Sequence, residues 1–70
     1  MNRDIAKGKW TQMKGLVRTQ WGKLTDDDLQ KMEGRGEVAI GRLQERYGHS
    51  REEAEKAWTE FVGRCERESS

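Results

Sequence analysis

Apolar residues recur at three- and four-residue steps in four stretches of the chain, the spacing that places side chains on one face of a helix. The first stretch holds Ala6, Trp10, Met13, Val17 and Trp21, and the second, much shorter, holds Leu29 and Met32. The third and fourth hold Gly36, Ala39, Ile40, Leu43 and Tyr47, and then Ala54, Ala57, Trp58, Phe61, Val62 and Cys65. The pattern predicts helices over residues 4–21, 26–33, 37–47 and 51–65.

The link after the first stretch contains residues that end one helix and begin the next. Gly22 suits the left-handed residue that follows a helix end. Thr25 with Asp28 three residues later predicts a capping box. The three aspartates of residues 26–28 then fall in a first helical turn, where the helix dipole favours acidic side chains. Helix capping explains this acidic run better than a calcium loop, because the alternating oxygen spacing of such a loop is missing.

The same order of residues recurs before the last stretch and reveals an internal repeat. Gly48 is predicted to end the third helix, and Ser50 with Glu53 to form a second capping box. The glycines at 8, 15 and 22 are seven apart, as are those at 34, 41 and 48. The repeat predicts two related α-hairpins, which must pack on each other because neither can bury its apolar face alone.

Gly15 and Gly41 lie inside predicted helices, where a glycine costs about 1 kcal/mol relative to alanine. On a helical wheel both lie roughly opposite the apolar face. We expect another backbone to approach closely at these glycines, so that a side chain would not fit.

The composition is that of one small folded domain of low stability. The 70 residues contain only ten Leu, Ile, Val and Phe in total, but the net charge is +1 and three tryptophans add apolar area. We expect a single helical domain over residues 1–66 and a frayed tail over 67–70. One cysteine excludes an intramolecular disulfide, and no apolar run approaches 18 residues, so a cytoplasmic protein is expected.

No set of residues predicts catalysis, a cofactor or a metal site. His49 is the only histidine and has no second ligand or nucleophile beside it. Cys65 lies on the apolar face of the last helix, where packing is the simpler explanation. An enzyme is therefore not expected.

Basic residues form a flank beside the apolar face of the first helix. We name Arg3, Lys7, Lys14 and Arg18 the basic flank, to which Lys9 and Lys23 could add. Such a flank could follow phosphates, but a nearly neutral domain with its tryptophans in the core predicts weak nucleic-acid binding at most. Membrane binding is not expected, since the first helix must give its apolar face to the core.

Several segments resemble the CsbD-like family of small bacterial proteins. These are Lys14-Gly15, residues 20–28 (QWGKLTDDD), Glu33-Gly34 and residues 41–48 (GRLQERYG), and the resemblance covers about residues 1–58. It implies a small bundle of two crossed α-hairpins, similar to the SAM-domain arrangement. It also implies a cytoplasmic protein that accumulates during general stress, with no catalytic residues to carry over.

Two classes of function remain open at this point. The first is a stress-induced binding or protective module that acts through its abundance or through an unidentified protein partner. The second is a weak, non-specific nucleic-acid binder that uses the basic flank. In either case we expect a monomer without a cofactor.

Overall fold

The computed structural model describes residues 4–68, without the side chains of residues 66 and 68, and is mostly helical. Its helices are α1 (Lys7–Gln20), α2 (Asp26–Met32), α3 (Gly36–Tyr47) and α4 (Arg51–Glu68). No strand occurs in this part of the chain. The predicted all-α fold of four helices is confirmed.

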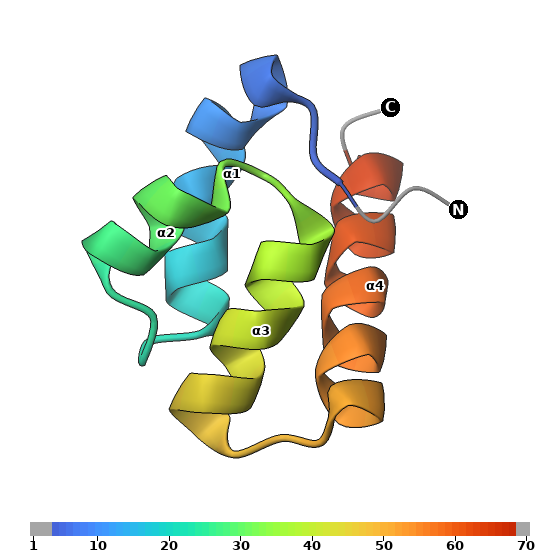
Figure 1. Cartoon of the computed structure of the whole chain (residues 1–70). Coiled ribbons are helices and arrows are strands. Elements are labelled where there is room, and N and C mark those ends of the chain that lie inside the picture. The colour runs from blue at the N-terminus through green and yellow to red at the C-terminus, as the bar shows by residue number, and fades with distance from the viewer. Residues whose placement is uncertain (1–3, 69–70) are drawn as a thin grey trace.

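The four helices pack as a small bundle (Figure 1). α3 and α4 lie side by side as an antiparallel pair joined by residues 48–50 (Figure 1). Within the described chain these two helices have the most extensive backbone contact, followed by α2 and α3. α1 keeps its backbone farther from the other helices, and its long side chains fill the space between.

One hydrophobic core joins all four helices. It contains three aromatic rings in contact, with ring centroids 4.9 Å apart for Trp21 and Phe61 and 5.7 Å apart for Trp21 and Trp58. These separations lie in the range in which aromatic pairs attract each other. The other buried apolar residues are Ile5, Trp10, Val17, Leu24, Leu29, Met32, Ala39, Ile40, Leu43, Ala54, Val62 and Cys65.

The predicted apolar faces are thus the buried ones, with a few differences. Ala6 is exposed, while Met13, Tyr47 and Ala57 are only partly buried. Ile5 and Leu24 lie outside the predicted faces, yet both are buried in the core.

α1 begins at Lys7 rather than at Asp4, because residues 4–6 lie against the turn between α2 and α3. The Ile5 N–H donates a hydrogen bond to the Gly34 carbonyl oxygen at 2.7 Å. The Ile5 side chain is buried at this point. Helical structure over residues 4–6 would remove this contact, so tertiary packing sets the start of α1.

The Asp4 side chain caps α3 from a distant position in the sequence. Its Oδ1 accepts a hydrogen bond at 2.7 Å from the N–H of Gly36, the first residue of α3 and 32 positions away. Arg35, which directly precedes α3, provides no side-chain cap. Asp4 therefore pairs one of the N–H groups that the start of a helix leaves without an internal partner.

Gly22 does not adopt the left-handed conformation, so that prediction is wrong. Among the described residues, positive φ angles occur only at Glu33, Gly34 and Gly48. α1 ends at Gln20, and the Leu24 N–H donates to the Trp21 carbonyl oxygen at 3.1 Å. The chain leaves α1 through this tight turn, which does not need a left-handed glycine.

Gly48 and Gly34 do have positive φ angles. Gly48 ends α3 at φ 69°, as predicted. Gly34 has φ 80° and follows Glu33, the left-handed residue (φ 48°) that ends α2. A Cβ atom at Gly34 would overlap the Ile5 carbonyl group, so this glycine is required by both conformation and space.

The close backbone approach expected at Gly15 and Gly41 is absent. A Cβ atom built on either glycine meets no heavy atom within 4 Å outside its own helical surroundings. Gly15 is exposed and Gly41 is partly buried. Both glycines face open space, because the apolar face that packs lies on the opposite side of each helix.

The C-terminal helix is longer than predicted. α4 continues through Glu68, whereas a frayed tail was expected from residue 67. In its last turn the Arg67 Nε donates to the Gly63 carbonyl oxygen at 3.4 Å. Residues 69–70 of the expected tail lie outside the described residues.

Candidate interaction surfaces

The basic flank of α1 is only partly available for binding. Lys7 is exposed, Lys14 is partly buried, and Arg3 lies outside the described residues. Arg18 forms an ion pair with Asp26 at the start of α2. This ion pair joins basic α1 to acidic α2, and it neutralises one end of the flank.

The two further lysines do not extend this flank as one surface. Lys9 is exposed on α1. Lys23 lies in the turn after α1, where its Nζ sits 5.2 Å from the centroid of the Tyr47 ring. Its backbone N–H also donates to the Tyr47 hydroxyl oxygen at 3.1 Å. Lys23 therefore ties this turn to the end of α3 by a cation–π contact and a hydrogen bond.

The first predicted capping box is present and forms part of a larger polar cluster. The Asp28 N–H donates to Thr25 Oγ1 and the Thr25 N–H donates to Asp28 Oδ2, both at 3.1 Å. Arg46 of α3 binds both carboxylate oxygens of Asp28, through Nε at 2.9 Å and Nη2 at 3.1 Å. Arg42 Nε lies 3.7 Å from Asp28 Oδ1. The cluster joins α2 to α3 through one carboxylate that is only 1% exposed.

Arg46 keeps Asp28 ionised. Its hydrogen bonds from Arg46, assisted by that from the Thr25 backbone, lower the pKa of Asp28 from 3.8 to about 2, although burial acts in the opposite direction. The same pair raises the pKa of Arg46. A carboxylate with so low a pKa cannot exchange protons efficiently near neutral pH, because general acid–base catalysis needs a pKa close to the working pH. Asp28 thus serves as a structural anion.

Sequence reasoning found the cap but missed its partners on α3. Arg46 is 18 positions from Asp28, too far for a local motif to connect them. One signal was present: Arg42 and Arg46 are four residues apart and therefore share a face of α3, opposite an acidic helix.

The second predicted capping box is also present. The Glu53 N–H donates to Ser50 Oγ at 3.2 Å, and the Ser50 N–H donates to Glu53 Oε1 at 3.1 Å. The bond from the Ser50 backbone lowers the pKa of Glu53. Next to this cap the His49 ring stacks on the Tyr47 ring, with centroids 5.6 Å apart and an interplanar angle of 7°. The contacts of these four residues therefore organise the link between α3 and α4.

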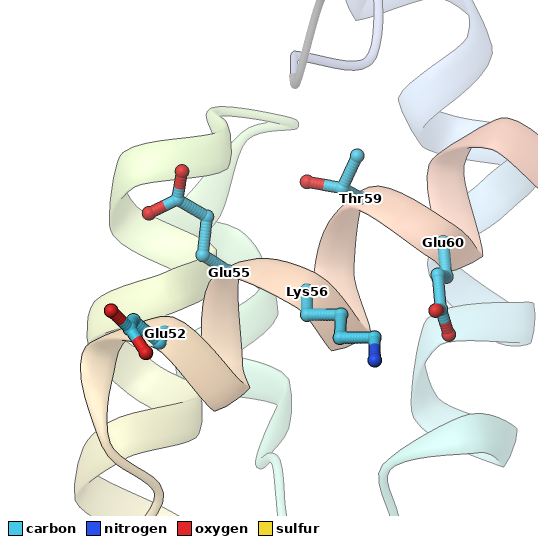
Figure 2. A pocket seen from close by; sticks show the side chains of 5 residues that line it. All are labelled: Glu52, Glu55, Lys56, Thr59 and Glu60. Carbon is cyan, nitrogen blue, oxygen red and sulfur yellow. The ribbon is translucent and has the colours of Figure 1, made fainter.

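The outer face of α4 carries a shallow depression of about 550 Å³ (Figure 2). All the side chains that line it come from this one helix: Glu52, Glu55, Lys56, Thr59 and Glu60. A depression built by a single helix has no opposing wall, so it cannot surround a ligand as a typical small-molecule pocket does. Its lining is acidic, the opposite of the basic flank.

The described residues contain neither a metal-binding cluster nor a membrane-spanning helix. Residues 4–68 contain no group of three or more His, Cys, Asp or Glu side chains arranged to hold a metal ion. None of the helices in that range combines the length and the apolar character needed to cross a membrane.

Comparison with known proteins places the sequence among small bacterial proteins. A family model described as CsbD-like matches residues 4–56. A UPF0337 protein of Pseudomonas aeruginosa is 52% identical over 64 residues, which cover 91% of this chain and 98% of the relative. The UPF0337 protein YjbJ of Escherichia coli K12 is 48% identical over 66 residues (94% and 96%). One of Pectobacterium atrosepticum is 57% identical over 56 residues (80% and 81%). These names state no activity.

Proposed function

This chain belongs to the CsbD-like family, and on that premise we propose that it acts in the bacterial general stress response as a small binding or protective module without catalytic activity. We place it in the cytoplasm as a monomer. It works through the surface of a folded helical domain, by its abundance or by contact with a protein partner.

The state of Asp28 is the observation that carries the non-catalytic part of this proposal. It is the one buried charged side chain of the described core, the kind of group that often serves in catalysis. Here two arginines and a helix N-terminus bind it, and its pKa is about 2. Its interactions cap α2 and hold α2 on α3, so its ionisation supports the fold and leaves no proton to transfer.

The alternative of weak nucleic-acid binding gains no support from the arrangement of the basic flank. Arg18 is paired with Asp26 and Lys14 is partly buried, so Lys7 is its only fully exposed member within the described residues that makes no ion pair. One exposed, unpaired cation among the described members of the flank neutralises too few phosphates for appreciable affinity.

The stress role is tested by survival of cells that lack this chain. Cells that lack the gene for this chain, and the same cells with the gene restored at its native expression level, are compared in stationary phase, at high salt and under oxidation. We expect lower survival of the deleted cells in at least one condition, restored by complementation. Equal survival in all three conditions would contradict a stress role.

The class of partner is tested separately by quantitative pull-down of the native protein from stressed cells, with and without nuclease. A protein that is retained equally after nuclease treatment supports the protein-binding form of the proposal. Material that is lost after nuclease treatment, or on raising the salt, would support the nucleic-acid alternative instead.

A further inference from the structure

A small apolar groove separates α1 from the second half of α4. It has a volume of about 180 Å³ and is lined by Leu16, Thr19, Gln20, Phe61, Arg64 and Cys65; we call it the α1–α4 groove. Its floor is the edge of the core, since Phe61 and Cys65 are each 6% exposed. Leu16 forms one wall. It is a large apolar side chain that is 50% exposed, whereas the other large apolar side chains among the described residues are buried or partly buried. The groove thus offers an apolar floor beside an apolar wall.

The rim of the groove carries a cation. Arg64 is exposed and takes part in none of the ion pairs among the described side chains, which do not include those of residues 66 and 68. Glu60 lies one helical turn before Arg64 and lines the depression on α4 (Figure 2), but no ion pair between the two side chains is found. The Thr19 hydroxyl already donates to the Gly15 carbonyl oxygen at 2.9 Å. The guanidinium of Arg64 is therefore the rim group suited to an anionic ligand.

The size of the groove decides which kind of occupant fits. A protein interface covers about 800 Å² on each partner, far more than one exposed leucine and a small hollow provide. Pockets for drug-sized molecules have about 300–1,000 Å³, again more than is present. A short alkyl chain fits a hollow of about 180 Å³. An arginine at its rim favours a carboxylate, whose two oxygens match the guanidinium fork.

We propose that the α1–α4 groove binds a short aliphatic carboxylate. The alkyl chain lies against Leu16 and Phe61, and the carboxylate pairs with the Arg64 guanidinium. The α4 side of the groove follows residue 56, where the family match ends, and its α1 side lies within the matched range, so the matched region alone does not form this site. The proposal is independent of the stress role, which is tested by a different measurement.

The test is a titration of the full ¹⁵N-labelled chain with octanoate at pH 7, followed by amide chemical shifts. We expect saturable shifts confined to the residues that line the groove, with a Kd on the order of 1 mM. Octanol and octyltrimethylammonium, which have the same chain with a neutral or a cationic head, should bind more weakly.

Variants assign the binding to the groove. Arg64→Gln should weaken octanoate binding by about threefold, within the range of an exposed ion pair, and Leu16→Ala should weaken it by a similar factor. Both side chains are exposed, so both variants should fold, which circular dichroism checks. Lys56→Gln, which removes a cation from the other face of α4, is the matched control and should change nothing. No saturable shift up to about 10 mM, unchanged binding by Arg64→Gln, or equal affinity for the cationic amphiphile would overturn the proposal.

Discussion

Replacing Asp28 with asparagine should destabilise the domain in a way that depends on pH. The substitution keeps the shape of the side chain but removes the charge that Arg46 binds through two hydrogen bonds. The fall in the pKa of Asp28 from 3.8 to about 2 corresponds to about 2.4 kcal/mol, at about 1.36 kcal/mol for each pH unit. The Arg46 side chain is 42% exposed, so solvent screening reduces this to about 1–2 kcal/mol.

The pH dependence follows from the direction of the pKa change. The pKa of Asp28 is lower in the folded state, so its contribution is complete above pH 4 and is lost as the pH falls through about 2. Asparagine does not titrate, and the wild type and the variant should therefore converge in stability toward pH 2. Glu53, whose pKa is also lowered, is present in both proteins and cancels in the difference.

Urea denaturation followed by tryptophan fluorescence, at several pH values, measures this effect. Asp27→Asn is the matched control, because Asp27 is 71% exposed and pairs only with Lys31 at 3.2 Å; it should cost less than about 0.5 kcal/mol. The reasoning would be refuted if the wild type and Asp28→Asn had the same free energy of unfolding at pH 7. It would also be refuted if the difference in this free energy stayed constant down to pH 2.

Three further predictions test the remaining parts of the account. Gly15→Ala and Gly41→Ala should each stabilise the domain by roughly 0.5–1 kcal/mol, seen as a higher Tm, since nothing lies within 4 Å of either new methyl group; a lower Tm for both would mean that the helices pack more tightly there. Gly34→Ala should lower the stability by more than about 1 kcal/mol in the same assay, because the residue has a φ of 80° and its new methyl group would overlap the Ile5 carbonyl group. An unchanged Tm would contradict the contact between residues 4–6 and the α2–α3 turn. Binding to DNA or RNA should be weak, with a Kd of about 10⁻⁴–10⁻⁶ M, and raised salt should abolish this binding. The double variant Lys7→Glu with Lys14→Glu should also abolish it without unfolding the domain. Submicromolar, salt-resistant binding would restore the nucleic-acid alternative.

Features determined by neighbouring residues could be predicted from the sequence. Each capping box joins residues three apart, and each apolar face repeats within one helix, so local spacing was sufficient. The left-handed Gly48 is of the same kind. The four-helix, all-α fold followed from these signals together.

Features determined by contacts between distant segments could not be predicted. Asp4 caps α3 from 32 positions away, and Ile5 binds the Gly34 carbonyl group; these contacts, rather than any helix-start signal, delay α1 to Lys7. Gly22 resembled a helix terminator, but the path of the link toward Leu24 decided its conformation. For α3 the apolar pattern identified the buried face correctly. Whether another segment packs against Gly41 on the opposite face depends on tertiary packing, which the pattern does not show.

The same limit applies to the candidate surfaces. The basic flank could be recognised from spacing, but the ion pair between Arg18 and Asp26 depends on how α1 and α2 meet. The α1–α4 groove combines residues from two helices that are about 45 positions apart, such as Leu16 and Phe61. No local motif connects such residues before the chain is folded.

The central claim is that this chain acts in stress survival through its folded surface and without catalytic chemistry. The most direct test is to complement deleted cells with a double variant, His49→Gln with Cys65→Ala, which lacks the only imidazole and the only thiol of the chain. With protein level and helical content matched to wild type, the account predicts that this variant restores survival fully. Loss of survival by a folded variant at normal abundance would contradict the claim, because it would show that one of these two reactive groups is needed.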